Sequence, residues 1–405
     1  MRTTVALLVS ASVLATAAPA LAQEKLGEPI AITDNLALDI IFDSRLRYET
    51  VSEDKALDTA EALTLRGRLG ATLTSGGFQF LAEGEGTAVF FDEFNDTLPY
   101  NGTEPYSVVA DPQNLELNRL QISYMKNGSG ATVGRQRIIL DNARFVGNVG
   151  WRQNEQTFDA VRAQAKLGPV KLDATYANSQ RTIFGNSSPN EHFNGDLIFL
   201  NAGAKLGPVD LTGFSYTIDY DTRVAFSSQT FGGIARFSLP LPGVPLSATA
   251  SYARQSEIGG APVAYDADYF HGELGATVFG LKATVGYEEL GSDDGVAAFQ
   301  TPLATLHAFN GWADMFLVTP ANGLVDYYAG IGRGLSIGGV GPLNFGVTYH
   351  EFDSDFGDIE YGNEWDAVIG TKFRGVGMLV KYASYQAESF GVDTEKLWLQ
   401  LEYAF

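Results

Sequence analysis

The chain ends in "LWLQLEYAF" (397–405), and the fold can be argued from this segment. Every second side chain is apolar, which is the period of a β-strand with one apolar face: Leu397, Leu399, Leu401, Tyr403 and Phe405. A strand at a chain terminus usually frays. A terminal strand this regular therefore predicts a partner on both sides, and a closed barrel supplies one by pairing its last strand with its first.

The first 22 residues have the features of a secretory signal peptide. They contain one positive charge at Arg2, an apolar run over 5–14 and a small-x-small site that ends at Ala22. The alternative, an amino-terminal membrane anchor, is disfavoured because the run is too short to span a bilayer. We therefore expect export, cleavage near Ala22 and a single domain over 23–405, since no linker divides the rest of the chain.

Composition excludes several classes of protein. A formal net charge of −21 disfavours nucleic-acid binding, and the absence of cysteine excludes disulfides and cysteine metal sites. After the signal peptide, no apolar run is long enough for a spanning helix, whereas Tyr (18) and Phe (26) are abundant. Because only helices and closed barrels pair all backbone groups inside a bilayer, a membrane protein of this composition is expected to be a β-barrel.

Strict alternation recurs near the start of the mature chain, in the segments 36–49, 62–73 and 78–90. In each, apolar side chains take one face and Arg, Asp, Glu, Gln or Thr take the other. A soluble β-sandwich has the same period. The charged mid-strand face and the terminal Phe405 favour the barrel.

An internal repeat marks the turns. "KLGPVKLDATY" (166–176) recurs as "KLGPVDLTGFSY" (205–216), with looser copies at 241–252, 279–287, 341–349 and 374–385. Adding 74–77 and 126–130 gives about eight short periplasmic turns, which predicts an antiparallel transmembrane barrel of about 18 strands. The Tyr that closes each copy is expected near the outer interface, as part of an aromatic girdle. The longer connections, 92–114, 137–157, 178–195, 291–323 and 353–362, are then extracellular, and 291–323 is long enough to fold into or over the lumen.

Two loop segments carry a family resemblance: "GRQRIILDNARFVGNVGWRQNEQTFDAV" (134–161) and "FQTPLATLHAFNGWADMFLVTPANGLVDYYAG" (299–330). They resemble the two best-marked stretches of the alginate-export family of outer-membrane porins. The matching loop residues are Arg144, Trp151, His307, Asn310, Trp312 and Asp314, and Met315 stands where the family pattern has Lys. The resemblance implies an export or diffusion channel in the outer membrane without fixing the solute. A general diffusion porin for small polar nutrients is the alternative, and a lipid-acting enzyme barrel is a third.

Charged residues on the lumen face are the candidate pore lining: Arg45, Arg47, Arg66, Arg68, Glu83, Glu85, Arg119, Arg135 and Arg162. A ring of charged side chains at a constriction selects ions, so this arginine-rich set predicts an anion-selective channel. The alternative is that these groups pair across strands and only brace the wall. Arg135 is the exception, because alternation from Val133 points it at lipid unless a bulge at Gly134 redirects it.

The remaining candidates favour structural roles. Trp151 and Trp312 are expected to pin their loops to the wall, with sugar stacking as the alternative, and His307 to be a hydrogen-bonding group. No His has metal-ligand spacing and no Ser lies in a nucleophile elbow, so no cofactor and no catalytic residue are expected. The acidic segments 292–295 and 353–360 are expected to be solvated loops rather than calcium sites. Expected partners are outer-membrane lipid and lipopolysaccharide, the barrel-assembly machinery, whose carboxy-terminal signal the last strand resembles, and periplasmic export proteins.

Overall fold

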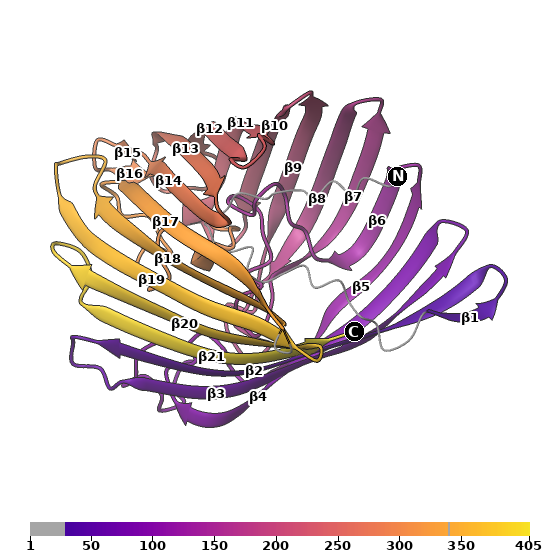
Figure 1. The fold of residues 1–405 in the computed structure, drawn as a ribbon, viewed down its shortest axis with the longest axis horizontal. Helices are drawn as coiled ribbons and strands as arrows, with labels where there is room; N and C mark the ends of the chain where they lie inside the picture. Colours follow the sequence, from indigo (N-terminus) through magenta and orange to yellow (C-terminus); the bar gives the residue numbers. More distant parts are fainter. Residues whose placement is uncertain (1–28, 339–340) are drawn as a thin grey trace.

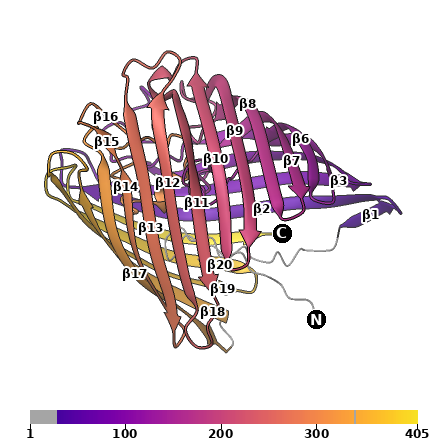
Figure 2. The same ribbon diagram turned by 90° about the horizontal axis from the view of Figure 1, so that it is seen from above.

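A computed structural model describes residues 29–338 and 341–405, so the expected signal peptide lies outside the described residues. The described chain forms one closed, antiparallel barrel of 18 strands (Figure 1), as the sequence predicts. Seen from above, the strands of one wall lie side by side in chain order (Figure 2). No helix among the described residues is long and apolar enough to cross a membrane.

The barrel strands follow one another around the wall in chain order. They are β2 (Leu36–Glu53), β3 (Ala60–Ser75), β4 (Phe78–Glu93), β5 (Asn114–Lys126), β6 (Ser129–Gln136), β7 (Thr157–Leu167), β8 (Val170–Arg181), β9 (His192–Leu206), β10 (Val209–Tyr220), β11 (Ser228–Leu239), β12 (Leu246–Glu257), β13 (Asp266–Val278), β14 (Leu281–Leu290), β17 (Leu324–Ile337), β18 (Gly341–Asp353), β19 (Glu360–Phe373), β20 (Val376–Ala387) and β21 (Thr394–Ala404). The minor elements are β1 (Ile30–Thr33), which pairs with β2, the small pair β15 (Ser292–Asp293) and β16 (Ala297–Ala298), and the 3-10 turns η1 (Val224–Phe226) and η2 (Leu306–Ala308).

The barrel closes between the last strand and the first long strand. β21 pairs with β2 from Asp43 opposite Ala404 to Glu53 opposite Thr394. Phe405 extends the ladder, because its N–H donates to the carbonyl of Phe42 at 2.9 Å and its own carbonyl accepts from Phe42 at 3.1 Å. The two phenyl rings stack with centroids 5.2 Å apart. The terminal strand is therefore paired on both sides, as its alternation predicts.

Deletion of Phe405 is expected to trap the chain before barrel closure. The deletion removes two ladder hydrogen bonds and the stack on Phe42 at the seam, where the barrel has no other strand to cover the edge. Heat-modifiable migration on a gel and protease sensitivity report assembly. Normal migration of the deletion variant would show that Phe405 is an ordinary interface aromatic, and Phe405→Tyr serves as the conservative control.

The two ends of the barrel differ in the length of their connections. One end carries the short turns, such as 76–77, 127–128, 168–169 and 207–208. The other end carries the long loops L2 (94–113), L3 (137–156), L4 (182–191), L7 (291–323) and L8 (354–359), which coincide with the five predicted long connections. Four shorter loops at that end, 54–59, 221–227, 258–265 and 388–393, were not marked by the turn repeat.

The outer wall carries most of the predicted tyrosine girdle, with two exceptions. Tyr176, Tyr252 and Tyr382 lie on outward rows, and their hydroxyls donate to the carboxylates of Asp196, Asp268 and Glu395. Tyr216 and Tyr385, which close two of the copies, instead face the lumen and are only 2% and 1% exposed. The copy that ends at Tyr216 is one residue longer after the turn than the copy that ends at Tyr176, and one extra residue moves a side chain to the opposite face of a strand.

Candidate functional site in the lumen

Loops L3 and L7 fold into the barrel and pair with each other, which confirms the expectation that 291–323 folds into the lumen. Val146 and Leu303 form a parallel bridge, and the N–H of Gly147 donates to the Leu303 carbonyl at 2.8 Å. The N–H of Thr305 donates to the carbonyl of Ala143 at 3.0 Å. We call the joined segments 137–156 and 299–318 the plug.

Arg144 and Asn310, one from each loop motif, connect the two halves of the plug to the wall. The Arg144 guanidinium donates to Glu288 at 2.7 Å, to Thr301 at 3.0 Å and to the side-chain oxygen of Asn310 at 3.0 Å. The amide of Asn310 donates to Glu288 at 2.7 Å and to Asp326 at 3.1 Å. L3 and L7 are therefore joined over β14 and β17 by buried, charge-assisted hydrogen bonds, which are stronger than neutral ones.

Trp151, His307 and Trp312 surround a lysine of the barrel wall. The Lys381 ammonium on β20 lies 3.6 Å from the ring centre of Trp312, 4.2 Å from that of Trp151 and 5.4 Å from that of Trp398. It also donates to Nε2 of His307 at 2.6 Å, and His307 stacks on Trp151 at 4.6 Å. We call this group the lysine cage. A cation–π contact strengthens when it is desolvated, so the cage fixes both loops to β20 and β21.

Asp314 completes the hydrogen bonding of the lysine cage. Its carboxylate accepts from Nδ1 of His307 at 2.7 Å, from Lys396 at 3.0 Å and from Arg152 at 3.3 Å. Because Lys381 donates to Nε2, His307 is neutral with its proton on Nδ1. Burial, with Lys381 close by, holds the pKa of His307 well below its usual range. Burial acts to raise the pKa of Asp314, but His307 and Lys396 beside it keep that pKa well below its usual range.

Acidification is expected to loosen the plug at the lysine cage. Both His307 and Asp314 have lowered pKa values when docked, so docking is complete above the ordinary histidine pKa of about 6.5 and weakens as pH falls below it. A proton on His307 would also place two cations in contact at Lys381. Single-channel conductance and its fluctuations, compared between pH 7 and about pH 4.5, measure the effect.

His192, half-buried at the outer end of β9 and away from the plug, is the matched control for this prediction. His307→Gln should reduce the pH dependence of single-channel conductance and of its fluctuations below about pH 6.5, the ordinary histidine pKa. His192→Gln should leave this pH dependence unchanged. Equal traces from all three proteins at both pH values would contradict a role for His307.

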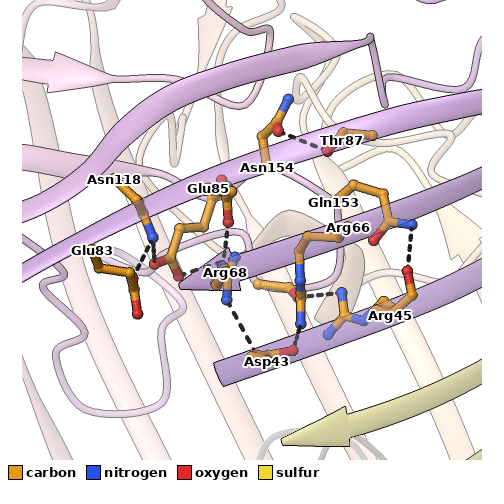
Figure 3. Close-up of polar contacts among 12 residues, drawn as sticks. Asp43, Arg45, Arg66, Arg68, Glu83, Glu85, Thr87, Asn118, Gln153 and Asn154 are labelled. Carbon is orange, nitrogen blue, oxygen red and sulfur yellow. Dashed lines mark hydrogen bonds and ion pairs between the residues drawn. The ribbon is translucent and has the colours of Figure 1, made fainter. Parts of the chain in front are cut away.

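The arginines of β2 and β3 face the lumen but are covered by L3 (Figure 3). Arg45 donates to the carbonyls of Gly150, Trp151 and Arg152 at 3.0 to 3.3 Å. Arg47 donates to Gln400 at 2.7 Å and stacks over Trp151 at 4.0 Å. These contacts fix the backbone of L3 to the wall.

Arg66 and Arg68 lie in a network of carboxylates. Arg66 pairs with Asp43, and Arg68 pairs with Glu85 and lies 3.7 Å from Glu155 of L3. The N–H of Glu155 also donates to Glu85 at 3.0 Å. Each of the two arginines thus has a carboxylate partner, and both are nearly inaccessible to solvent.

Glu83, Arg119 and Arg162 occupy the lumen rows closer to the short turns. Arg119 binds Glu83 at 2.6 and 2.8 Å, and Arg162 binds Asp173 at 2.6 and 3.0 Å. The side chains of Arg119 and Arg162 keep some exposure, 16% and 18%. Arg119 and Arg162 are therefore the members of the predicted set that remain partly exposed below the plug, whereas Glu83 is buried.

The expectation that Arg135 lines the pore is wrong, because the side chain lies on a row that faces away from the lumen. Its strand stays in register with β5 and β7, so Arg135 lies opposite Leu120 and Asp159, on the row that alternates with that of Arg162. Gly134 does have a positive φ of 117°, but the ladder continues through it. Arg135 pairs with Asp159 at 2.8 Å and donates to the carbonyl of Leu117 at 3.1 Å, so it braces the wall where β6 ends before β5 does.

Several charged residues and one histidine of the site were not among the site residues predicted from the sequence. Arg137, Arg152 and Glu155 lie inside the first loop motif, and Glu288, Asp326, His350, Glu364, Lys381 and Lys396 lie on the lumen rows of β14 to β21. The sequence signal that could have identified those on the strands is a charged residue on a row that faces the lumen. Of the described residues, no group of three or more His, Cys, Asp or Glu side chains could hold a metal ion.

A closed 18-stranded barrel with short turns at one end and long loops folded into its lumen is the architecture of an outer-membrane porin. The model of the alginate export family matches residues 37–221, which include the first loop motif. This match confirms the resemblance to the alginate-export family over β2 to β10. No curated protein sequence matches the chain.

Solved porin structures share the fold at low sequence identity. The chain is similar to Pseudomonas aeruginosa OccK9 (OpdG), with 13% identity, a TM-score of 0.73 and coverage of 91% of this chain and 98% of that one. For a BenF-like porin from Pseudomonas fluorescens Pf-5 the identity is 14%, the TM-score 0.71 and the coverage 91% and 98%. For Pseudomonas aeruginosa OpdK, solved with vanillate, the values are 13%, 0.69, 91% and 98%.

Proposed function

We propose that this outer-membrane porin passes anionic or polar solutes and carries out no catalysis. One observation carries the proposal: below the plug, the lumen rows keep lysines that form no ion pair within residues 29–338 and 341–405. They are Lys166, Lys171, Lys205, Lys282 and Lys372. The arginines above them are matched by carboxylates, so the unpaired lysines set the sign of the field in the open part of the channel.

The comparisons support this solute class. The matched family is described as alginate export, and alginate is an acidic polysaccharide. OpdK, of similar fold, was solved with vanillate, a small carboxylate. Solute movement would follow a concentration gradient, or a periplasmic export machine would drive it. Outer-membrane lipid, lipopolysaccharide and the barrel-assembly machinery are the proposed partners.

Reversal potentials across a planar bilayer in a salt gradient test the proposal. We expect anion preference at moderate ionic strength, where salt screens the acidic outer loops within about 8 Å. Cation preference at every salt concentration would refute the proposal. A large conductance without preference would instead favour a general diffusion porin for small polar nutrients. A lipid-acting enzyme would release fatty acid from outer-membrane lipid, and this can be assayed on the same preparation.

A further inference from the structure

Three lysines cluster at the short-turn end of the lumen, on the neighbouring strands β7, β8 and β9. Lys166 and Lys171 lie directly opposite each other in the β7–β8 ladder. Lys205 is on the next strand, two residues beyond Gly203, which lies opposite Lys171. All three are exposed and occupy the rows of Arg162 and Asp173, which face the lumen. We call Lys166, Lys171 and Lys205 the lysine crescent.

Within the described residues, no carboxylate forms an ion pair with a lysine of the crescent. Like charges directly opposite each other across an antiparallel pair are destabilising. The nearby Asp173 is occupied, because Arg162 and Gln164 both donate to it. Asp210 lies opposite Lys205 in the ladder, but the two form no ion pair in the described part of the chain. The arrangement therefore leaves adjacent ammonium groups available to an anion that carries more than one charge.

The opposite end of the barrel has the opposite charge. Its loops and strand ends carry many exposed or half-exposed carboxylates and few cations. Examples are Glu53, Asp54, Asp58, Glu104, Asp293, Asp294, Asp355, Asp358, Glu360, Glu388, Asp393 and Glu395. An anion arriving at the long-loop end is repelled, whereas one arriving at the short-turn end is attracted, and such fields change capture rates at low and moderate salt.

We propose that the lysine crescent is a capture site for multivalent anions and that such solutes enter the channel from the short-turn, periplasmic end. The inference rests on the proposed channel function and adds the side of entry and the residues of first contact. Above the crescent, the next cationic groups on the lumen face are Arg162, which is paired with Asp173, and Arg236, which lies 3.6 Å from Asp141 of the plug. A solute with a single charge would gain little from adjacent lysines.

One-sided block of single channels tests the site. A four-residue oligogalacturonate is added to one side at a time, with galacturonate monomer and a neutral four-residue oligosaccharide as comparison solutes. Because the chain has no cysteine, Ser187→Cys in L4 reports channel orientation through an impermeant thiol reagent. We expect block from the short-turn side at a roughly tenfold lower concentration than from the loop side.

The variant is the triple substitution Lys166→Gln, Lys171→Gln and Lys205→Gln, which should abolish the difference between the two sides. The matched control is Lys126→Gln with Arg333→Gln, two cations at the same end on outward rows, which should preserve it. Heat-modifiable migration confirms that each variant is folded.

The outcomes separate the two proposals. Open channels that are blocked equally from both sides, or an asymmetry that survives the triple substitution, overturn the capture site and leave the porin intact. Equal block by the monomer overturns the multivalent class. Block by a folded acidic protein but not by the oligogalacturonate would assign the crescent to a protein partner and overturn the inference. Absence of any conductance would instead refute the proposed function.

Discussion

Removal of residues 299–318 is expected to raise single-channel conductance by roughly twofold or more while the barrel still forms. The deleted residues are the L7 half of the plug and belong to none of the barrel strands. Without them, the wall positions that they cover, such as Glu364, which accepts from the N–H groups of Trp312 and Ala313, would face solvent. The packed side chains of L7 are then replaced by an open channel cross-section through which ions can pass.

The control for this deletion is a second loop deletion, made outside the lumen. Removing 99–103 from the exposed part of L2, where Tyr100 is 98% exposed, should leave conductance unchanged. Heat-modifiable migration shows whether each barrel has closed. Unchanged conductance in a folded 299–318 deletion would mean that L7 does not limit the passage.

The barrel could be predicted because its signals are local. Alternation, the repeated Gly/Pro turns and the terminal aromatic gave the strand number and the five longest loops. The short outer loops, such as 54–59, have no comparable repeat and were missed. The lumen face of Tyr216 was missed for a different reason: one added residue reverses a strand's faces, and a loose repeat does not reveal it.

The plug was predicted only in part, because its contacts are long-range. The sequence marked Arg144, Trp151, His307, Asn310, Trp312 and Asp314 as loop residues, and the structure brings them together. Their wall partners, above all Lys381 and Lys396, are distant in sequence and follow only from strand register combined with the inward path of L3 and L7. Alternation alone places an arginine on the lumen side without showing what covers it.

Arg68→Met is expected to release L3 from the wall near Glu155. Arg68 is the shared partner of Asp43, Glu85 and Glu155, and its side chain is only 7% exposed. Removing one partner of a buried ion pair costs about 3–5 kcal/mol, because the remaining charge stays buried without compensation. Glu85 loses the guanidinium that is hydrogen-bonded to it, whereas Glu155 keeps its pair with Arg137 and loses only the nearby charge of Arg68. The uncompensated Glu85 carboxylate then lies beside Glu155 of L3, whose N–H donates to it.

Hydrogen exchange of the amides at 150–155 measures the release. A loss of about 3 kcal/mol corresponds to a roughly hundredfold rise in exchange rate, if L3 opens locally rather than with the whole barrel. The double variant Arg68→Met with Glu85→Gln should recover most of the protection, because it restores the charge balance and keeps an oxygen to accept from the N–H of Glu155. Arg254→Met, which removes an exposed pair with Asp266, should change nothing. Protection that is equal in Arg68→Met and the parent protein would show that the carboxylate network does not hold L3, and that the Arg45 contacts and the lysine cage suffice.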